Sequence, residues 1–172
     1  MTLQNEKVKL RAPEPEDIDT LFDLENDELW WKYADRVQPY SKELLKEYLA
    51  HAQKDIFETR QLRFTIVNAQ DQVVGFVDLF DFEPLHHRAG VGLIIRKENQ
   101  RQGYGAAALE LLSDYAKTHL QLHQLYVHIA EENQSSIRLF EKQGYVFSGN
   151  KKDWNFYEGA YHNESIYQKL IR

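Results

Sequence analysis

The chain has 172 residues with 42% hydrophobic and 28% charged side chains, which is typical of a soluble globular protein that folds as a single domain over residues 1–172. A formal net charge of −6 argues against nucleic acid as the main partner, because phosphate contacts need a basic surface. The absence of cysteine excludes disulfides and a thiolate nucleophile, and the lack of a signal peptide or of an apolar run near the ~18 residues of a membrane span predicts a cytoplasmic protein with no membrane contact.

The N-terminal half predicts a strand, two helices and a hairpin. Alternating apolar residues predict a strand over residues 8–11, and a helix is expected to begin near residue 16. A second helix is expected from Ser41, because leucines and a tyrosine follow it at helical spacing. The alternating run 62–67 and the returning strand 73–80 flank a polar turn and therefore predict a hairpin.

The C-terminal half continues with alternating strands and helices. The expected elements are a strand over residues 89–95, a helix after Gly105, a strand over 125–129, a helix after Asn133 and an aromatic-rich strand pair within 145–148 and 155–170. Glu158-Gly159 is a typical hairpin turn. The order β-α-α-β-β-β-α-β-α-β-β predicts a mixed α+β fold.

The segment 91–109 carries the strongest functional signal. An apolar run meets the loop Gln100-Arg101-Gln102-Gly103-Tyr104-Gly105, which opens into an alanine-rich helix. The first N–H groups of a helix lack internal partners and lie at the positive end of its dipole, so this arrangement favours phosphate. A P-loop is excluded because Ala106 follows Gly105, and a dinucleotide fingerprint lacks its acidic residue about 20 positions further on.

The same loop resembles the Gln/Arg-x-x-Gly-x-Gly/Ala motif that binds pyrophosphate in the GNAT family of N-acetyltransferases. A second block supports the resemblance: the strand 125–129 leads to Asn133, a helix, Phe140 and then Gly144-Tyr145. The family pattern there is a strand, an asparagine, a helix, and an aromatic residue followed four positions later by Gly-Phe/Tyr. Over nearly its whole length, the chain looks most similar to the branch that holds spermidine/diamine acetyltransferases and acetyltransferases of ribosomal-protein N-termini.

The resemblance implies a GNAT acyl-CoA N-acyltransferase fold, with a mixed, mostly antiparallel sheet of about seven strands flanked by about four helices. It also implies acetyl-CoA as cofactor, with its pyrophosphate on the glycine loop and its pantetheine arm along the preceding strand. Asn133 matches an asparagine that contacts the cofactor, and it equally suits a helix N-cap. The expected cofactor-binding residues are Leu93, Ile94, Ile95, Gln100, Arg101, Gln102, Gly103, Tyr104, Gly105, Ala106, Asn133, Ser136 and Phe140.

The chemistry departs from the family pattern at two positions. Many relatives have a tyrosine as general acid where this chain has Phe140, and related polyamine enzymes have a glutamate where it has Gly90. An alkyl ammonium has no lone pair and must lose a proton before it attacks, so a base is still useful. The expected catalytic residues are therefore Asp78 or Asp81 as base and Tyr145 as proton donor, with Tyr126 and unassisted thiolate departure as alternatives.

The region before Ser41 is acidic and aromatic. Residues 14–28 contain eight acids and no lysine or arginine, and aromatic residues follow them. Carboxylates beside aromatic faces suit an ammonium ligand, although the acids also complement a helix dipole and the aromatics can fill a core. The expected substrate-binding residues are Trp30, Trp31, Tyr33, Asp35 and His87.

We therefore predict an acetyl-CoA-dependent N-acetyltransferase that moves an acetyl group to a primary amine by direct transfer in a ternary complex. A diamine or polyamine is the favoured small-molecule substrate. Two alternatives remain open: acetylation of the N-terminus of a ribosomal or other protein, and a non-catalytic acyl-CoA-binding regulatory role, which Phe140 and Gly90 favour. The resemblance also allows a homo-oligomer. No bound metal is expected, because the spacing of His119 and His123 fits the end of a helix.

Overall fold

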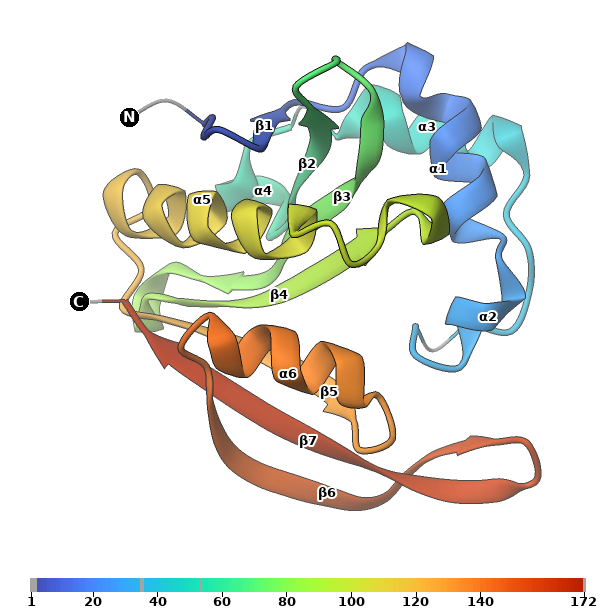
Figure 1. The fold of residues 1–172 in the computed structure, drawn as a ribbon, viewed down its shortest axis with the longest axis vertical. Helices are drawn as coiled ribbons and strands as arrows, with labels where there is room; N and C mark the ends of the chain where they lie inside the picture. Colours follow the sequence, from blue (N-terminus) through green and yellow to red (C-terminus); the bar gives the residue numbers. More distant parts are fainter. Residues whose placement is uncertain (1–2, 35, 53, 172) are drawn as a thin grey trace.

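The computed structural model describes residues 3–34, 36–52 and 54–171 (Figure 1). Seven strands form one sheet in the order β1-β2-β3-β4-β5-β7-β6. They are β1 (Val8–Arg11), β2 (Leu62–Asn68), β3 (Val73–Glu83), β4 (Arg88–Ile95), β5 (Gln124–Ala130), β6 (Val146–Tyr157) and β7 (Ala160–Leu170). Neighbouring strands are antiparallel except β4 and β5, which confirms the predicted mixed, mostly antiparallel sheet.

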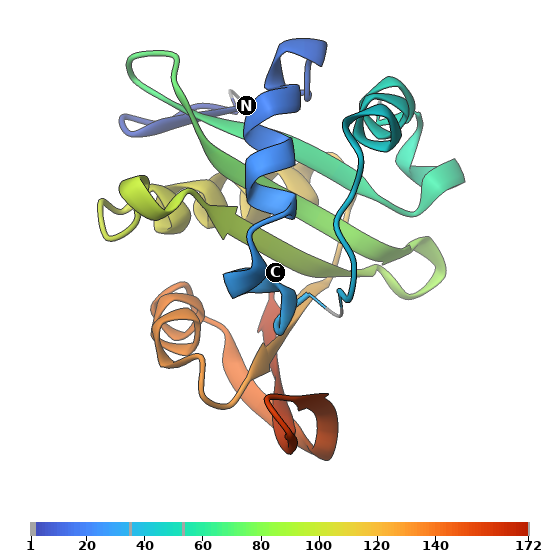
Figure 2. The same ribbon diagram turned by 90° about the vertical axis from the view of Figure 1, so that its right-hand side faces the viewer.

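Helices cover both faces of the sheet (Figure 2). Four of the described helices have eight residues or more, in agreement with the prediction: α1 (Ile18–Glu25), α3 (Lys42–His51), α5 (Tyr104–Thr118) and α6 (Gln134–Lys142). Two one-turn helices, α2 (Glu28–Trp31) and α4 (Ile56–Thr59), were not predicted, because one turn is too short to show a helical period. In the part of the chain that the structure describes, no helix is long and apolar enough to cross a membrane.

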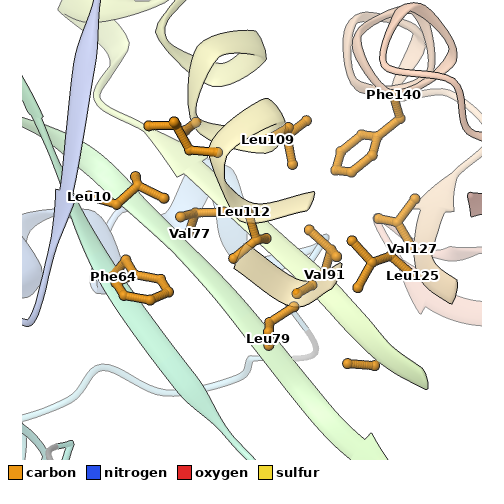
Figure 3. Packing of buried hydrophobic residues seen from close by; sticks show 14 of the residues in the cluster. Leu10, Phe64, Val77, Leu79, Val91, Leu109, Leu112, Leu125, Val127 and Phe140 are labelled. Carbon is orange, nitrogen blue, oxygen red and sulfur yellow. The ribbon is translucent and has the colours of Figure 1, made fainter. Parts of the chain in front are cut away.

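The alternation of β3 divides the core into two clusters. Val77 and Leu79 point to the side of the sheet that α5 covers, where they join Leu109 and Leu112 (Figure 3). Phe76 points to the other side, into a smaller cluster with apolar residues of α1 and α3. The sheet therefore separates an α5–α6 face from an α1–α3 face.

The register of β4 positions the functional site. β4 pairs with β3 along most of its length, from Gly75↔Ile95 to Glu83↔Arg88. Among the described residues it pairs with β5 only at three positions, the last of which is Gly90↔Tyr126. Because β5 instead continues with β7 as far as Ala130, β4 and β5 diverge beyond Gly90 (Figure 1). The main-chain groups of residues 91–95 that point toward β5 are therefore left outside the sheet pairing.

Two details differ from the sequence prediction. β6 is one long strand, although its middle residues 149–154 lack apolar alternation; it follows β7 with register shifts at Phe147/Gly149 and Lys151/Asn155. Leu44, which shares helical spacing with the apolar residues of α3, is 49% exposed, and Leu45 and Leu49 form the buried stripe. Tertiary packing, which one helix period does not specify, decides which of these leucines face the core.

Candidate active site

The N-terminus of α5 is an open row of backbone donors. Gly103 is the N-cap residue, with φ = 84°, and it has no side chain with which to cap the helix. The first intrahelical bond runs from the Ala107 N–H to the Gly103 carbonyl (3.1 Å), so the N–H groups of residues 104–106 have no partner within the helix. A positive φ strains other residues, which explains the glycine at this position. The arrangement suits an anion.

The loop before α5 is held in place by its own side chains. Gln100 Nε2 donates to the Ile95 carbonyl (3.1 Å), and Gln102 Nε2 donates to the Glu98 carbonyl (3.0 Å). Lys7 Nζ donates to the Gln102 carbonyl (3.3 Å) from the N-terminal segment. These bonds fix the curvature of the loop before any ligand is present.

A cavity of about 600 Å³ lies between this loop, β4 and α6. All of the predicted cofactor-binding residues except Gln102 line it. The wall also contains Trp30, which was expected to bind the amine, and residues that the sequence did not single out: Asn99, Ser135, Arg138, Leu139 and Lys142. The predicted residues thus come together around one space, while Gln102 supports the loop from outside.

The cavity is locally basic, in contrast to the net charge of −6. Arg101 comes from the loop, and Arg138 and Lys142 come from α6. The two α6 residues are four positions apart and therefore share a helix face, a spacing that could have identified them in the sequence. Asn133 also lines the cavity, and its Oδ1 accepts the Ser136 N–H (3.2 Å) as the N-cap of α6, so it can serve both predicted roles.

Phe140 forms part of the cavity wall and screens Tyr145 from it. Their rings meet edge to face, with centroids 5.0 Å apart. Tyr145 does not line the cavity, and its buried Oη has no hydrogen-bond partner among the described residues. Burial raises the pKa of Tyr145 well above its ordinary value. The structure therefore places the predicted proton donor behind Phe140 instead of facing the cavity.

Of the two predicted bases, Asp78 is already engaged in an ion pair. Its carboxylate accepts hydrogen bonds from Arg63 Nε (2.5 Å) and Nη2 (2.9 Å). Arg63 Nη1 also donates to Glu25 Oε1 (2.9 Å), and Arg36 Nη2 donates to Glu25 Oε2 (2.5 Å). Although burial alone would lower the pKa of Arg63, its acidic partners raise it. The network ties α1 to β2 and β3 and leaves Asp78 with a structural task.

Asp81 instead lines a second, polar cavity of about 450 Å³ with Tyr126. It sits in the β-bulge between Phe80 and Glu83, with φ = 46°. Tyr126 pairs with Gly90, the last β4 residue in register with β5, so this cavity adjoins the point where the strands diverge. Burial raises the pKa of Tyr126, and the negative charge of Asp81 contributes to that shift.

The glutamate that the resemblance implies near this point has no room here. A Cβ atom added to Gly90 would lie 2.4 Å from the Phe80 ring. Phe80 pairs with Gly90 in the register of β3 and β4 and contacts the Tyr126 ring edge to face (6.2 Å). An aromatic side chain of the neighbouring strand thus occupies the space.

The predicted substrate-binding residues do not form one group. Trp30 lines the larger cavity, whereas the Trp31 Nε1 donates to the Glu25 carbonyl (3.2 Å). Tyr33 is 37% exposed beside Lys32, and His87 lies at the opposite end of β4 from the glycine loop, with Nδ1 3.0 Å from the Gln121 carbonyl. Asp35 lies outside the described residues.

Several acids of residues 14–28 have structural partners. Asp17 accepts from Arg11, Asp19 pairs with Lys42, and the Asp27 side chain caps α2. These tasks explain much of the acidic bias that the sequence analysis connected with a cationic ligand.

A histidine and a glutamate lie close together on the neighbouring strands β5 and β7. β5 carries His128 two residues after Tyr126, with its Nδ1 3.7 Å from Glu164 Oε1, a pair to which the sequence analysis gave no role. Among the described residues, no group of three or more histidine or acidic side chains could hold a metal ion.

Residues 7–146 match the family described as Acetyltransferase (GNAT) domain. Spermidine N(1)-acetyltransferase from Vibrio cholerae serotype O1 is 31% identical over 159 residues, which cover 91% of this chain and 89% of the relative.

Solved structures of spermidine N-acetyltransferases are also similar to this chain. A crystal structure of spermidine N-acetyltransferase from Vibrio cholerae in complex with CoA and spermine superposes with a TM-score of 0.87 at 29% identity, covering 97% of both chains. A dodecameric structure of the Vibrio cholerae spermidine N-acetyltransferase in an intermediate state superposes with a TM-score of 0.80 at 29% identity, covering 97% of this chain and 95% of the other.

Proposed function

Because the chain belongs to the GNAT acetyltransferase family, we propose that it transfers the acetyl group of acetyl-CoA directly to a primary amine of a diamine or polyamine, in a ternary complex. The observation that carries the proposal is the divergence of β4 and β5 beside the open N-terminus of α5. One cavity thereby offers backbone donors for phosphate and a free strand edge for an extended amide chain. The similarity to spermidine acetyltransferases supports the polyamine class.

The residues that line the cavity fit acetyl-CoA, which would supply an activated acyl thioester. The N–H groups of residues 104–106 and the Arg101 guanidinium suit the pyrophosphate, and Arg138 and Lys142 suit a further phosphate. The exposed edge of residues 93–95 suits the amides of the pantetheine arm. Gly105 lets the start of α5 lie close to β4, because a Cβ atom at this position would lie only 3.2 Å from a Leu93 methyl group.

For the chemistry, we assign proton acceptance to Asp81. An ammonium group must lose its proton before it can attack, and the Asp81 carboxylate lines a polar cavity with Tyr126, the partner of Gly90, whereas both oxygens of Asp78 are held by Arg63. Phe140 cannot donate a proton and Tyr145 lies behind it. Departure of the thiolate without a general acid therefore fits best, because a thiolate whose conjugate thiol has a pKa of about 8.5 is a good leaving group.

The proposal extends to the whole chain, which we take to act as one acetyltransferase domain over residues 1–172, in the cytoplasm and as a homo-oligomer. The dodecameric Vibrio cholerae structure supports the oligomer, and the outer edge of β6, which pairs with no other strand among the described residues, offers a surface for it.

The test is thiol release from acetyl-CoA with spermidine, spermine, putrescine, an aminoglycoside and short peptides as acceptors. We expect turnover with the polyamines. Turnover with peptides alone would replace the polyamine proposal with N-terminal acetylation. Binding of acetyl-CoA without turnover on any of the amines would indicate the non-catalytic acyl-CoA-binding role.

Two matched glycine variants control the assay. Gly103→Ala and Gly159→Ala both place an alanine at positive φ (84° and 77°), so they carry a similar backbone strain of about 1–2 kcal/mol. Only Gly103 borders the cavity. We expect Gly103→Ala to weaken acetyl-CoA binding about 10-fold or more in calorimetry, and Gly159→Ala to leave the dissociation constant unchanged. Equal effects of the two variants would reject the glycine loop as the phosphate site.

A further inference from the structure

An indole donor in the wall of the cofactor cavity lacks an acceptor. Trp30, at the third position of α2, lines the cavity together with Leu93 and Ile94 of β4. Its Nε1 is buried and has no hydrogen-bond partner among the described residues. The adjacent Trp31 differs, because its Nε1 donates to the Glu25 carbonyl (3.2 Å). Buried donors in native proteins are nearly always paired, so an unpaired donor on a residue that lines a binding cavity points to a ligand.

The short helix α2 holds this donor from outside the cavity. The Asp27 side chain accepts the Leu29 N–H (3.0 Å) at the start of α2. At its end, the Trp31 indole is bound to the Glu25 carbonyl, and the Glu25 carboxylate is held by Arg36 and Arg63. Contacts that involve no ligand therefore hold α2, the helix that carries Trp30, in place.

Because the Trp30 Nε1–H is a hydrogen-bond donor, its partner must be an acceptor, and this requirement distinguishes acetyl-CoA from the polyamine. An ammonium group of a polyamine offers only donors and cannot accept from an indole N–H. The phosphates of the cofactor are assigned to backbone and basic groups of α5 and α6. The extended arm of the cofactor, which is assigned to residues 93–95 in the same cavity, carries carbonyl oxygens, and a carbonyl oxygen is the acceptor that an N–H group requires.

We propose that the Trp30 Nε1–H donates a hydrogen bond to a carbonyl oxygen of the acyl-pantetheine arm, which makes Trp30 a positioning residue for the cofactor. This role differs from the expected contact of Trp30 with the amine. The inference rests on the proposed acetyl-CoA site. Two oxygens of the same chemistry are available, the thioester carbonyl of acetyl-CoA and the amide carbonyls that CoA also carries.

The direct test is the indole N–H signal in ¹H–¹⁵N NMR spectra of the full chain. The chain has three tryptophans, and Trp30→Phe assigns the signal of Trp30 by its disappearance. We expect this signal to move downfield when acetyl-CoA saturates the protein, more than the signals of Trp31 and Trp154. A shift with acetyl-CoA but not with CoA would identify the thioester oxygen, and a shift with both would identify an amide oxygen. An unmoved signal at saturation would overturn the proposal.

Calorimetry provides a second readout that is independent of turnover. Trp30→Phe keeps an aromatic ring but removes the N–H group, and we expect acetyl-CoA to bind about 10-fold more weakly, which corresponds to about 1.4 kcal/mol. Trp154→Phe is the matched control, because Trp154 is 59% exposed on β6 and does not line the cavity. An unchanged dissociation constant for Trp30→Phe would overturn this inference alone. Failure of the unmodified chain to bind acetyl-CoA would instead overturn the proposed function and this inference with it.

Discussion

At the scale of single residues, two aspartates of β3 that lie three positions apart have different surroundings. Asp81 lines a polar cavity, whereas the Asp78 carboxylate is held by Arg63. We expect Asp81→Asn to lower kcat about 100-fold, because the amide cannot accept the proton of the amine, with little effect on stability. Steady-state kinetics with the best polyamine, together with urea unfolding, checks both expectations.

Asp78→Asn provides the contrast. It leaves the guanidinium of Arg63 without its bidentate partner inside the protein, so we expect a loss of about 3 kcal/mol in the free energy of unfolding. The residual folded enzyme should keep most of its kcat. The opposite result, a stable Asp78→Asn protein with no turnover and an active Asp81→Asn protein, would transfer the role of base to Asp78.

A pH-dependent contribution to stability is expected from Asp17. Burial alone would raise the pKa of Asp17, but hydrogen bonds from Arg11, the Glu14 N–H and Thr65 outweigh it and hold the pKa below its ordinary value. A carboxyl with a depressed folded-state pKa stabilises the protein above its unfolded pKa of about 4, and this contribution is lost as the pH falls through the folded pKa.

Urea unfolding of Asp17→Asn measures this contribution. We expect the variant to be about 2 kcal/mol less stable than the unmodified chain at pH 7, and the difference to shrink as the pH is lowered below 4. Asp19→Asn is the control, because Asp19 pairs with Lys42 at the exposed surface and should change stability by less than about 0.5 kcal/mol. A difference that stays constant between pH 7 and pH 3 would contradict the ionic origin of the effect.

Some residues of the site could be predicted from the sequence and others could not. The sequence contains the features that local backbone geometry requires, such as Gly103 before α5 and Asn133 before α6, and both were predicted. The role of Asp78 depends on its contact with Arg63, which results from the pairing of β2 with β3. The position of Tyr145 depends on its contact with Phe140, which results from the packing of α6. Residue types and spacing do not encode such contacts, so these roles could not be read from the sequence.

At the scale of elements, the fit between β3 and β4 has a measurable consequence at Phe80 and Gly90. A Cβ at Gly90 would lie 2.4 Å from the Phe80 ring, so we expect Gly90→Ala to cost about 2 kcal/mol of stability through overpacking. The cost should be smaller when Phe80 is also replaced by leucine, which gives a coupling energy of about 1 kcal/mol in a double-mutant cycle. Urea unfolding of the four proteins measures it.

Gly149→Ala is the reference for that cycle. A Cβ at Gly149 meets nothing within 4 Å, so this substitution should leave stability nearly unchanged. If Gly90→Ala behaves like Gly149→Ala, the space beside Phe80 is not restricted, and the missing glutamate needs another explanation.

Helices and strands were predicted where an apolar run or a helical period is long enough to be recognised in the sequence. β2, β3 and β4 are apolar-rich runs of seven residues or more, and α5 shows a clear apolar face, so their positions followed from the sequence. The divergence of β4 from β5 could not be predicted in the same way. It results from β5 pairing with β7, a strand about 40 residues later in the chain, and it is this long-range pairing that creates the cavity.

At the scale of the whole molecule, the sheet ends in an exposed aromatic edge. β6 is the last strand, so its outer edge has no strand partner in the part of the chain that the structure describes (Figure 1). Trp154, Phe156 and Tyr161 are 59–66% exposed on the β6–β7 hairpin, and the rings of Phe156 and Tyr161 are 5.0 Å apart. An unpaired strand edge flanked by apolar side chains is unusual for a monomer and favours association.

We therefore expect the chain to form a homo-oligomer through β6, and Phe156→Glu to dissociate it, because the new carboxylate would be buried in the contact. Light scattering coupled to gel filtration should give a multiple of 20.4 kDa for the unmodified chain and a mass close to 20.4 kDa for the variant.

Phe57→Glu is the matched control, since Phe57 on α4 is exposed to a similar extent (57%) but lies outside the hairpin. Acetyl-CoA affinity should be unaffected by Phe156→Glu, because the hairpin contributes no residue to the larger cavity. A monomeric unmodified chain, or an oligomer that survives Phe156→Glu, would show that the aromatic edge has another role.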